Sequence, residues 1–117
     1  MIELHLPAPL SVNRTRRLNK AALGEIARWE AEADRLYLWQ KRDIGMMNSV
    51  EPPYEVYIVL NKACRLDGDN GVKILLDTAV RFGLLPDDGP KYVRRIVVEY
   101  GDAEYGSRLI IRPFKVG

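Results

Sequence analysis

The sequence contains only one cysteine and one histidine among its 117 residues. The single Cys64 cannot form an intramolecular disulfide, which is typical of a reducing compartment, so we expect a cytoplasmic location. No apolar run has the length of a membrane span, and the N-terminus lacks the apolar region of a signal peptide. The formal net charge of +2 is too small to indicate nucleic-acid binding by itself. These absences exclude a disulfide-stabilised scaffold and predict no membrane partner.

The composition is that of a folded domain, with 47% hydrophobic and 29% charged residues. The length suits one domain with one core, so we predict a single domain over residues 1–117. Nothing repeats, and no segment is of low complexity. Basic residues cluster near the N-terminus and in two later stretches, whereas many acidic residues lie in two loops.

The hydrophobic pattern predicts an α/β or α+β fold with the order β-α-β-α-β-β. Alternating apolar residues predict strands at 2–6, 54–60, 92–100 and 108–112, and helical spacing predicts helices from about 19 to 47 and from about 70 to 82. Asn19 is suited to cap the first helix, and Gly83 to end the second. Gly101 and Gly106 separate the last two strands and predict an antiparallel hairpin. We therefore expect a mixed sheet covered by two helices.

Three ring-bearing residues have both structural and functional interpretations. His5 occupies an outward position of the first strand and is interpreted as an ordinary surface residue. Trp29 and Trp39 lie on the first predicted helix and could stack on nucleobases. Aromatic residues on a helix are more often core or dimer contacts, which favours the structural interpretation.

The stretch LDGDNGVKILLD, residues 66–77, gathers acidic side chains in one loop. One interpretation is a turn in which Asp69 or Asn70 caps the following helix. This interpretation leaves Asp67 without a role. A calcium loop of the EF-hand type is excluded, because Val72 and Thr78 occupy positions that require glycine and glutamate.

A magnesium site is the third interpretation of this loop. A second acidic pair, Asp87 and Asp88, follows the next helix, and a crossover helix returns the chain beside its starting strand. The two acidic pairs could therefore meet at one edge of the sheet, where carboxylates bind Mg²⁺ or Mn²⁺ together with a phosphate. Lys73 lies one turn into the helix, where it could contact a phosphate oxygen in the transition state. It could equally form an i,i+4 pair with Asp77, and the two roles are compatible.

Three spaced motifs carry a family resemblance over essentially the whole chain. D-x-D-N-x-x-K starts at Asp67, G-x-x-x-D-D ends at Asp88, and PAPLSVNR lies near the N-terminus. Together they resemble the RusA family of Holliday-junction resolvases, whose N-terminal stretch reads P-P-S-x-N-R. The resemblance implies a homodimeric, Mg²⁺-dependent endodeoxyribonuclease (Mn²⁺ being a possible substitute) that nicks four-way DNA junctions symmetrically in recombination and repair.

The resemblance also implies roles for individual residues. Asp67, Asp69 and Asp88 match the family's metal-binding catalytic acids, Lys73 matches its catalytic lysine, and Asp87 is a further candidate metal ligand. The residues expected to contact DNA are Asn13, Arg14, Arg16, Arg17, Lys62, Arg65 and Asn70. The segment NKACRL departs from the family, which usually has a run of arginines before D-x-D, and this predicts weaker phosphate binding. The glutamine that commonly follows the D-D pair is also missing.

Two alternatives keep part of this interpretation. A less selective nuclease acting on forks or flaps would use the same metal site. A junction-binding protein without catalysis would use its acidic residues as loop caps and its basic stretches to bind branched DNA.

Overall fold

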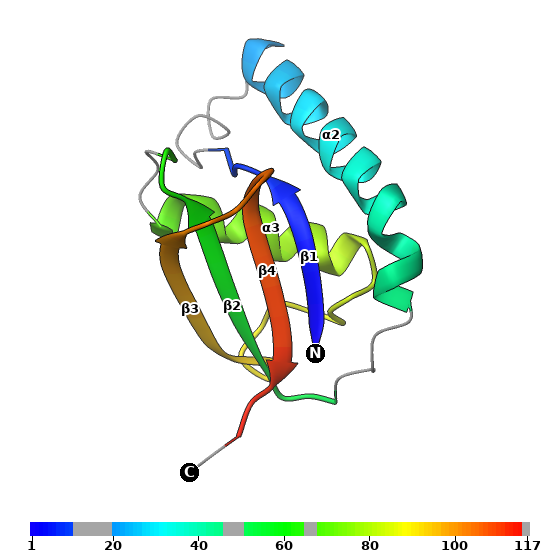
Figure 1. Ribbon diagram of the computed structural model, residues 1–117, viewed down its shortest axis with the longest axis vertical. Coiled ribbons are helices and arrows are strands. Elements are labelled where there is room, and N and C mark those ends of the chain that lie inside the picture. The colour runs from blue at the N-terminus through cyan, green and yellow to red at the C-terminus, as the bar shows by residue number, and fades with distance from the viewer. Residues whose placement is uncertain (11–19, 46–50, 65–67, 116–117) are drawn as a thin grey trace.

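The protein, in a computed structural model, is described over residues 1–10, 20–45, 51–64 and 68–115, with the side chains of 20–22 and 68–71 outside that description. Over these residues, a mixed sheet and two helices form a small α+β domain (Figure 1). The strands are β1 (Ile2–Pro7), β2 (Tyr54–Asn61), β3 (Val93–Gly101) and β4 (Gly106–Pro113), and the helices are α2 (Lys20–Gly45) and α3 (Gly68–Arg81). The predicted order of elements is confirmed, with bounds that shift by one or two residues at most.

The strands form a sheet in the order β1-β4-β2-β3. β2 and β3 are parallel and are connected through α3, so this helix is a crossover connection. β4 pairs antiparallel with β1 on one side and with β2 on the other. The predicted antiparallel hairpin between the last two strands is therefore wrong, because β3 and β4 lie on opposite sides of β2.

The connection from β3 to β4 crosses the end of β2 instead of turning back along β3 (Figure 1). Asn61, the last residue of β2, holds this connection by donating its side-chain amide to the carbonyl oxygen of Ala103 at 2.9 Å. Ala103 itself is buried. The two glycines correctly indicated a turn, but they could not specify the partner of β4, because strand pairing depends on residues distant in the sequence.

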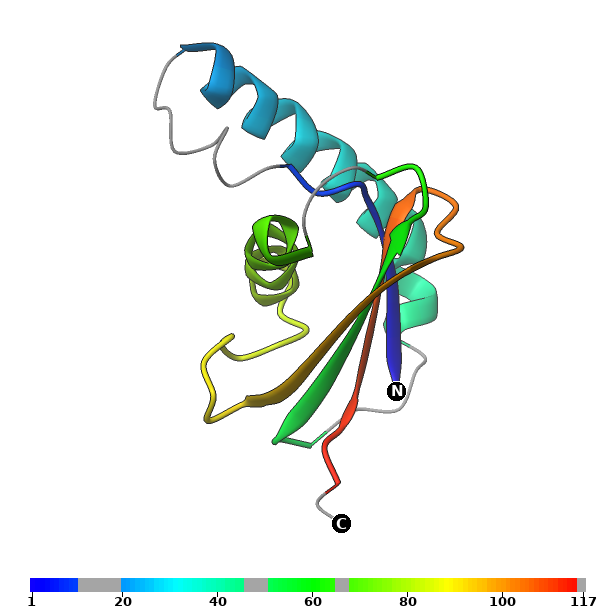
Figure 2. The ribbon, with the colours of Figure 1, turned by 90° about the vertical axis from the view of Figure 1, so that its left-hand side faces the viewer.

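Helix α3 covers one face of the sheet (Figure 2). Leu75 and Ala79 of this helix lie one turn apart and are fully buried. The strands contribute most of the remaining core residues, which include Leu4, Leu6, Tyr54, Val56, Ile58, Leu60, Leu109 and Ile111, and α2 adds Trp29, Ala33 and Ile44. Gly83 follows the helix with a φ of +78°, which confirms its predicted place at the C-terminal end.

Helix α2 packs against β1 and against the C-terminal end of α3. Its tryptophans have different environments: Trp29 is buried and donates its indole N–H to the carbonyl oxygen of Ala8, whereas Trp39 is 71% exposed. The Tyr37 ring stacks on Phe82 of the segment after α3, with ring centroids 4.1 Å apart. Trp29 is thus a core residue, and the expected cap at Asn19 lies outside the described residues. Neither described helix is long and apolar enough to cross a membrane.

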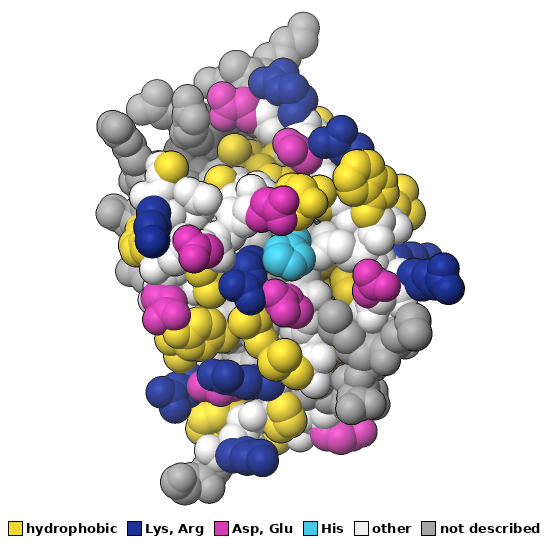
Figure 3. Space-filling view, in the orientation of Figure 1, with side chains coloured by type: hydrophobic (Ala, Val, Ile, Leu, Met, Phe, Trp, Pro, Cys, Tyr) yellow, Lys and Arg dark blue, Asp and Glu magenta, His cyan; other side chains and the backbone are white. Residues whose placement is uncertain are grey.

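The face of the sheet opposite α3 carries charged and polar side chains from all four described strands (Figure 3). Glu55 of β2 is the most enclosed of these charges, with a side chain only 14% exposed. It accepts a hydrogen bond from Arg112 Nε at 2.7 Å and lies 3.2 Å from Arg95 Nε. A sheet with one face on the core and one face solvated commonly shows this distribution.

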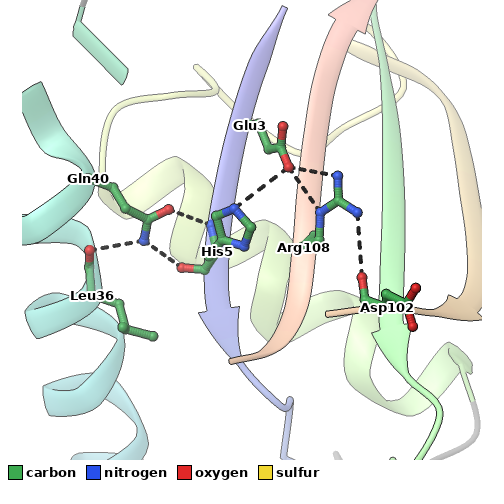
Figure 4. A network of polar contacts seen from close by, with 6 residues as sticks. All are labelled: Glu3, His5, Leu36, Gln40, Asp102 and Arg108. Atoms are coloured by element: carbon green, nitrogen blue, oxygen red, sulfur yellow. Dashed lines mark hydrogen bonds and ion pairs between the residues drawn. The ribbon is translucent and has the colours of Figure 1, made fainter. Parts of the chain in front are cut away.

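The outer edge of β1 is capped by one side chain of α2 (Figure 4). The backbone N–H of His5 donates to Gln40 Oε1 at 2.7 Å, and Gln40 Nε2 donates to the His5 carbonyl oxygen at 2.8 Å. The amide of Gln40 thus replaces a neighbouring strand at this position. The imidazole of His5 lies on the open face, 3.6 Å from Glu3, as expected of an outward strand residue.

Candidate functional site

An open cleft of about 400 Å³ lies between α3 and β3, on the helix-covered side of the sheet. Lys73 and Asp88 line it together with four apolar residues, Val72, Leu76, Ile96 and Val98. These residues come from three consecutive segments: α3, the loop that follows it, and β3. The crossover connection is what brings them together, because it returns the chain past the helix to the strand beside β2.

Lys73 lies on the exposed side of α3, with 70% of its side chain accessible. Its ammonium group is 3.7 Å from Asp77 Oδ1, so the expected i,i+4 pair is present. Exposed pairs of this kind contribute about 0.3–0.5 kcal/mol, which leaves the lysine free to exchange this partner for another anion. The position of Lys73 in the cleft is therefore compatible with phosphate binding.

The two adjacent aspartates after α3 have different environments. Asp87 turns back on its own loop: its Oδ1 accepts a hydrogen bond from the Asp88 backbone N–H at 2.9 Å. Asp88, by contrast, lines the cleft. The turn continues through Gly89, whose carbonyl oxygen accepts from the backbone N–H groups of Tyr92 and Val93. The geometry thus separates a loop-stabilising Asp87 from an Asp88 that faces the cleft.

The acidic motif before α3 is described only in part. The helix begins at Gly68, so Asp69 and Asn70 lie within its first turn and do not precede it as capping residues. The interpretation in which one of them precedes and caps the helix therefore does not fit, because the helix starts about two residues earlier than the apolar periodicity indicated. Asp67 and the side chains of Asp69 and Asn70 lie outside the described residues.

Of the two acidic motifs that were expected to meet, the structure describes the second with its side chains, but not the side chains of the first. β3 is an edge strand, and Asp88 approaches it beside the second turn of α3. Asp69 belongs to the preceding turn of the same helix. Among the described residues, Asp88 and the backbone of Asp69 therefore lie toward the same end of α3.

A bound cation would need several oxygen ligands here, because Mg²⁺ prefers carboxylates together with water and substrate oxygens. Among the described residues, no group of three or more His, Cys, Asp or Glu side chains is placed to hold a metal ion. Asp88 is the only candidate acid of the cleft whose side chain the structure describes. Its carboxylate has the right donor chemistry, and a complete ligand set would require Asp67 and Asp69.

Most residues expected to contact DNA lie outside the described part of the chain: Asn13, Arg14, Arg16, Arg17, Arg65 and the side chain of Asn70. Lys62 is described and follows β2. Its side chain is 75% exposed and its ammonium group is 3.8 Å from Asp102 Oδ1. Such an exposed pair is weak, so Lys62 is accessible to a phosphate.

Sequence reasoning did not find the apolar part of the cleft. Ile96 and Val98 of β3 face α3, next to Val72 and Leu76 of the helix. Their alternation was visible in the sequence, but the predicted hairpin gave β3 a second neighbour and so concealed its position at the edge. An edge strand leaves these side chains beside an open cleft, and Ile96 remains 43% exposed.

Comparisons of the chain with protein-family models, with curated proteins and with solved structures found no match.

Proposed function

We propose that this protein is a Mg²⁺-dependent, structure-specific endodeoxyribonuclease that resolves four-way DNA junctions by paired symmetrical nicks. The observation that best supports the proposal is the cleft shared by Lys73 and Asp88. The two residues come from different segments, and both match the RusA-like motifs. The first turn of α3, which contains Asp69, adjoins the same cleft.

The residues of the chain have distinct roles in this proposal. Asp88, Asp69 and Asp67 would hold the cation, which would supply Lewis-acid activation of water and of the scissile phosphate. Lys73 balances the negative charge that develops on the phosphate oxygens. The apolar wall of Ile96 and Val98 gives the deoxyribose and base beside that phosphate a surface to pack against. Lys62 and the basic residues near the N-terminus bind the DNA backbone without reading its sequence.

The proposal is tested by a nicking assay on a labelled four-way junction, run beside a fork and a linear duplex with and without Mg²⁺. We expect paired nicks on the junction, and a loss of at least about 100-fold in rate for Lys73→Met, because the charge that acts in the transition state is removed. Glu104→Gln, which removes an exposed carboxylate from the loop between β3 and β4, serves as the matched control and should cut at the wild-type rate.

The other outcomes correspond to the two alternatives. Cutting of the fork and the junction at similar rates would indicate a less selective nuclease with the same site. Tight junction binding with no cutting in Mg²⁺ or Mn²⁺ would indicate a binding protein, and would overturn the enzymatic proposal.

A further inference from the structure

A second pocket, of about 440 Å³, lies on the open face of the sheet, opposite the face that carries the cleft. Three basic residues line it, Arg95, Arg112 and Lys115, and the acidic Glu55 lies among them. Figure 3 shows basic side chains gathered around an acidic one in the lower part of this face. None of these side chains takes part in the chemistry proposed for the cleft, so the pocket requires an explanation of its own.

Glu55, Arg95 and Arg112 form a row across three neighbouring strands. Glu55 of β2 is the register partner of Arg95 on β3 and of Arg112 on β4. Its Oε1 lies 3.2 Å from Arg95 Nε, and its Oε2 accepts a hydrogen bond from Arg112 Nε at 2.7 Å. Both contacts are made through Nε, so the terminal NH₂ groups of each guanidinium are available as donors to a ligand.

A structural ion pair accounts for only part of this row. The Glu55 carboxylate is only 14% exposed, and one guanidinium is enough to balance its charge. The second arginine therefore leaves an excess of positive charge. Lys115 adds to this excess, because within the described residues its side chain makes no ion pair. An excess of this kind favours an anionic ligand.

The donors of the pocket are held in place by contacts around them. The Arg112 guanidinium carbon lies 5.3 Å from the centre of the Tyr57 ring, a cation–π contact that adds to its bond with Glu55. The segment after β4 is held by the Phe114 backbone N–H, which donates to the Pro53 carbonyl oxygen at 2.9 Å. Groups that are positioned in advance lose less entropy when a ligand binds.

The chemistry of the lining matches a phosphate on a nucleic-acid strand. Guanidinium groups donate in a planar fork that fits two phosphate oxygens at once. Phe114 lines the same pocket and offers an aromatic surface beside the cations. Cationic and aromatic side chains are combined in this way where proteins bind nucleic-acid strands.

The pocket is close in the chain to the cleft, on the other face of the same edge strand. Arg95 directly precedes Ile96, which lines the cleft, and successive residues of a strand point to opposite faces. A polymer bound in the cleft can therefore pass around the edge of β3 and reach the pocket.

We propose that the pocket of Arg95, Arg112 and Lys115 binds a backbone phosphate of DNA at a point outside the cleft, with Glu55 positioning the two guanidinium groups. The phosphate chemistry of the pocket stands on its own residues. The choice of DNA as the source of that phosphate rests on the proposed function.

The test is fluorescence anisotropy of a labelled four-way junction in EDTA, measured over a range of KCl concentrations. Arg112→Gln and Lys115→Gln should each bind about three- to tenfold more weakly than wild type, and the slope of log K against log[KCl] should become shallower by about 1, because one phosphate contact is lost. Lys41→Gln, which removes one exposed positive charge from α2, is the matched control and should keep the wild-type affinity and slope.

The two variants differ in their structural consequences. Arg112→Gln removes a partner of Glu55, whereas Lys115→Gln changes an exposed side chain without an ion pair in the described structure. Lys115→Gln therefore decides the result if Arg112→Gln fails to fold.

Direct titration with thymidine monophosphate distinguishes a strand phosphate from a free nucleotide. We expect no binding at micromolar concentration, because a single phosphate makes only one of the contacts that a junction makes. Micromolar binding of the nucleotide that Arg112→Gln or Lys115→Gln abolishes would identify a nucleotide pocket and overturn the assignment to DNA.

The outcomes separate this site from the proposed function. Wild-type affinity and salt dependence in both variants would overturn the phosphate site and leave the nuclease proposal standing. Junction binding that depends on the pocket, in a protein that cuts no DNA, would support the site and overturn the enzymatic proposal. Because EDTA removes the metal, cutting does not affect the measured affinities.

Discussion

Gly106 is a position at which one added methyl group has a severe steric consequence. Its φ is +130°, and a Cβ atom built on it would lie 2.1 Å from the backbone nitrogen of Ala8. We expect Gly106→Ala to reduce the free energy of unfolding by about 3 kcal/mol or more, because both the backbone conformation and the packing against Ala8 would be lost. Urea unfolding followed by circular dichroism measures the change.

Gly45→Ala is the matched control for this substitution. Gly45 is the last residue of α2, and a Cβ atom there would meet nothing within 4 Å. The free energy of unfolding of the Gly45→Ala variant should stay within about 0.5 kcal/mol of wild type. Equal effects at both glycines would show that the close approach of Gly106 to Ala8 is not what requires glycine.

Two tyrosines couple stability to alkaline pH. Burial raises the pKa of Tyr54, and a hydrogen bond to the Glu99 carboxylate raises the pKa of Tyr57, both from an ordinary value of 10.0. The folded state therefore retains protons that the unfolded chain releases. This contribution to stability is complete below the tyrosine pKa of the unfolded chain, and is lost as pH rises through the higher folded pKa.

We accordingly expect the urea midpoint to fall between about pH 9 and about pH 11. The double variant Tyr54→Phe/Tyr57→Phe should show a shallower fall over the same range, because neither ring can ionise. An identical fall in the variant and the wild type would assign the alkaline loss to other groups.

At the scale of single residues, the sequence showed which side chains could bind a metal ion better than it showed which way those side chains point. It identified both Asp87 and Asp88 as candidate metal ligands, and the structure turns one of them toward its own loop. That difference depends on the turn around Gly89, which is set by backbone hydrogen bonds and not by the identity of the two acids. The i,i+4 pair of Lys73 and Asp77 could be predicted because helix geometry alone determines it.

At the scale of elements, Gln40 shows how a helix protects the edge of a sheet. Its side chain makes two hydrogen bonds to the backbone of His5, at 2.7 and 2.8 Å. Gln40→Leu should lower the free energy of unfolding by about 1–3 kcal/mol, since it leaves a partly buried N–H and C=O unpaired. Lys41→Leu, at the exposed neighbouring position, should change it by less than about 0.5 kcal/mol in the same urea titration. Comparable losses in both variants would contradict the capping role.

The elements themselves could be predicted because their signals are local. Alternation located each strand, and apolar residues at helical spacing located α2, on which Trp29, Ala33 and Leu36 are buried. The insertion of β4 between β1 and β2 could not be read in the same way. It depends on contacts between residues near the two ends of the chain, such as the pairing of Leu4 with Leu109.

At the scale of the whole molecule, the crossover from β2 through α3 to β3 positions the candidate site. It places the cleft at an open edge of the sheet, where a long polymer can approach without threading through the protein. The expectation that the acidic motifs lie near each other rested on this crossover, and among the described residues it is Asp88 that lines the cleft. The apolar wall of the cleft could not be predicted from the sequence, because recognising it requires knowing that β3 is the edge strand.

The most direct test of the cleft as a catalytic site is the effect of Asp88→Asn on a four-way junction. Binding and Mg²⁺-dependent nicking should be measured on the same preparations, with Asp43→Asn on α2 as the matched control. We expect Asp88→Asn to lose at least about 100-fold in nicking rate, while junction affinity stays equal or increases because a negative charge facing phosphate is gone. Nicking by Asp88→Asn at the rate of the control would contradict the assignment of the chemistry to this cleft.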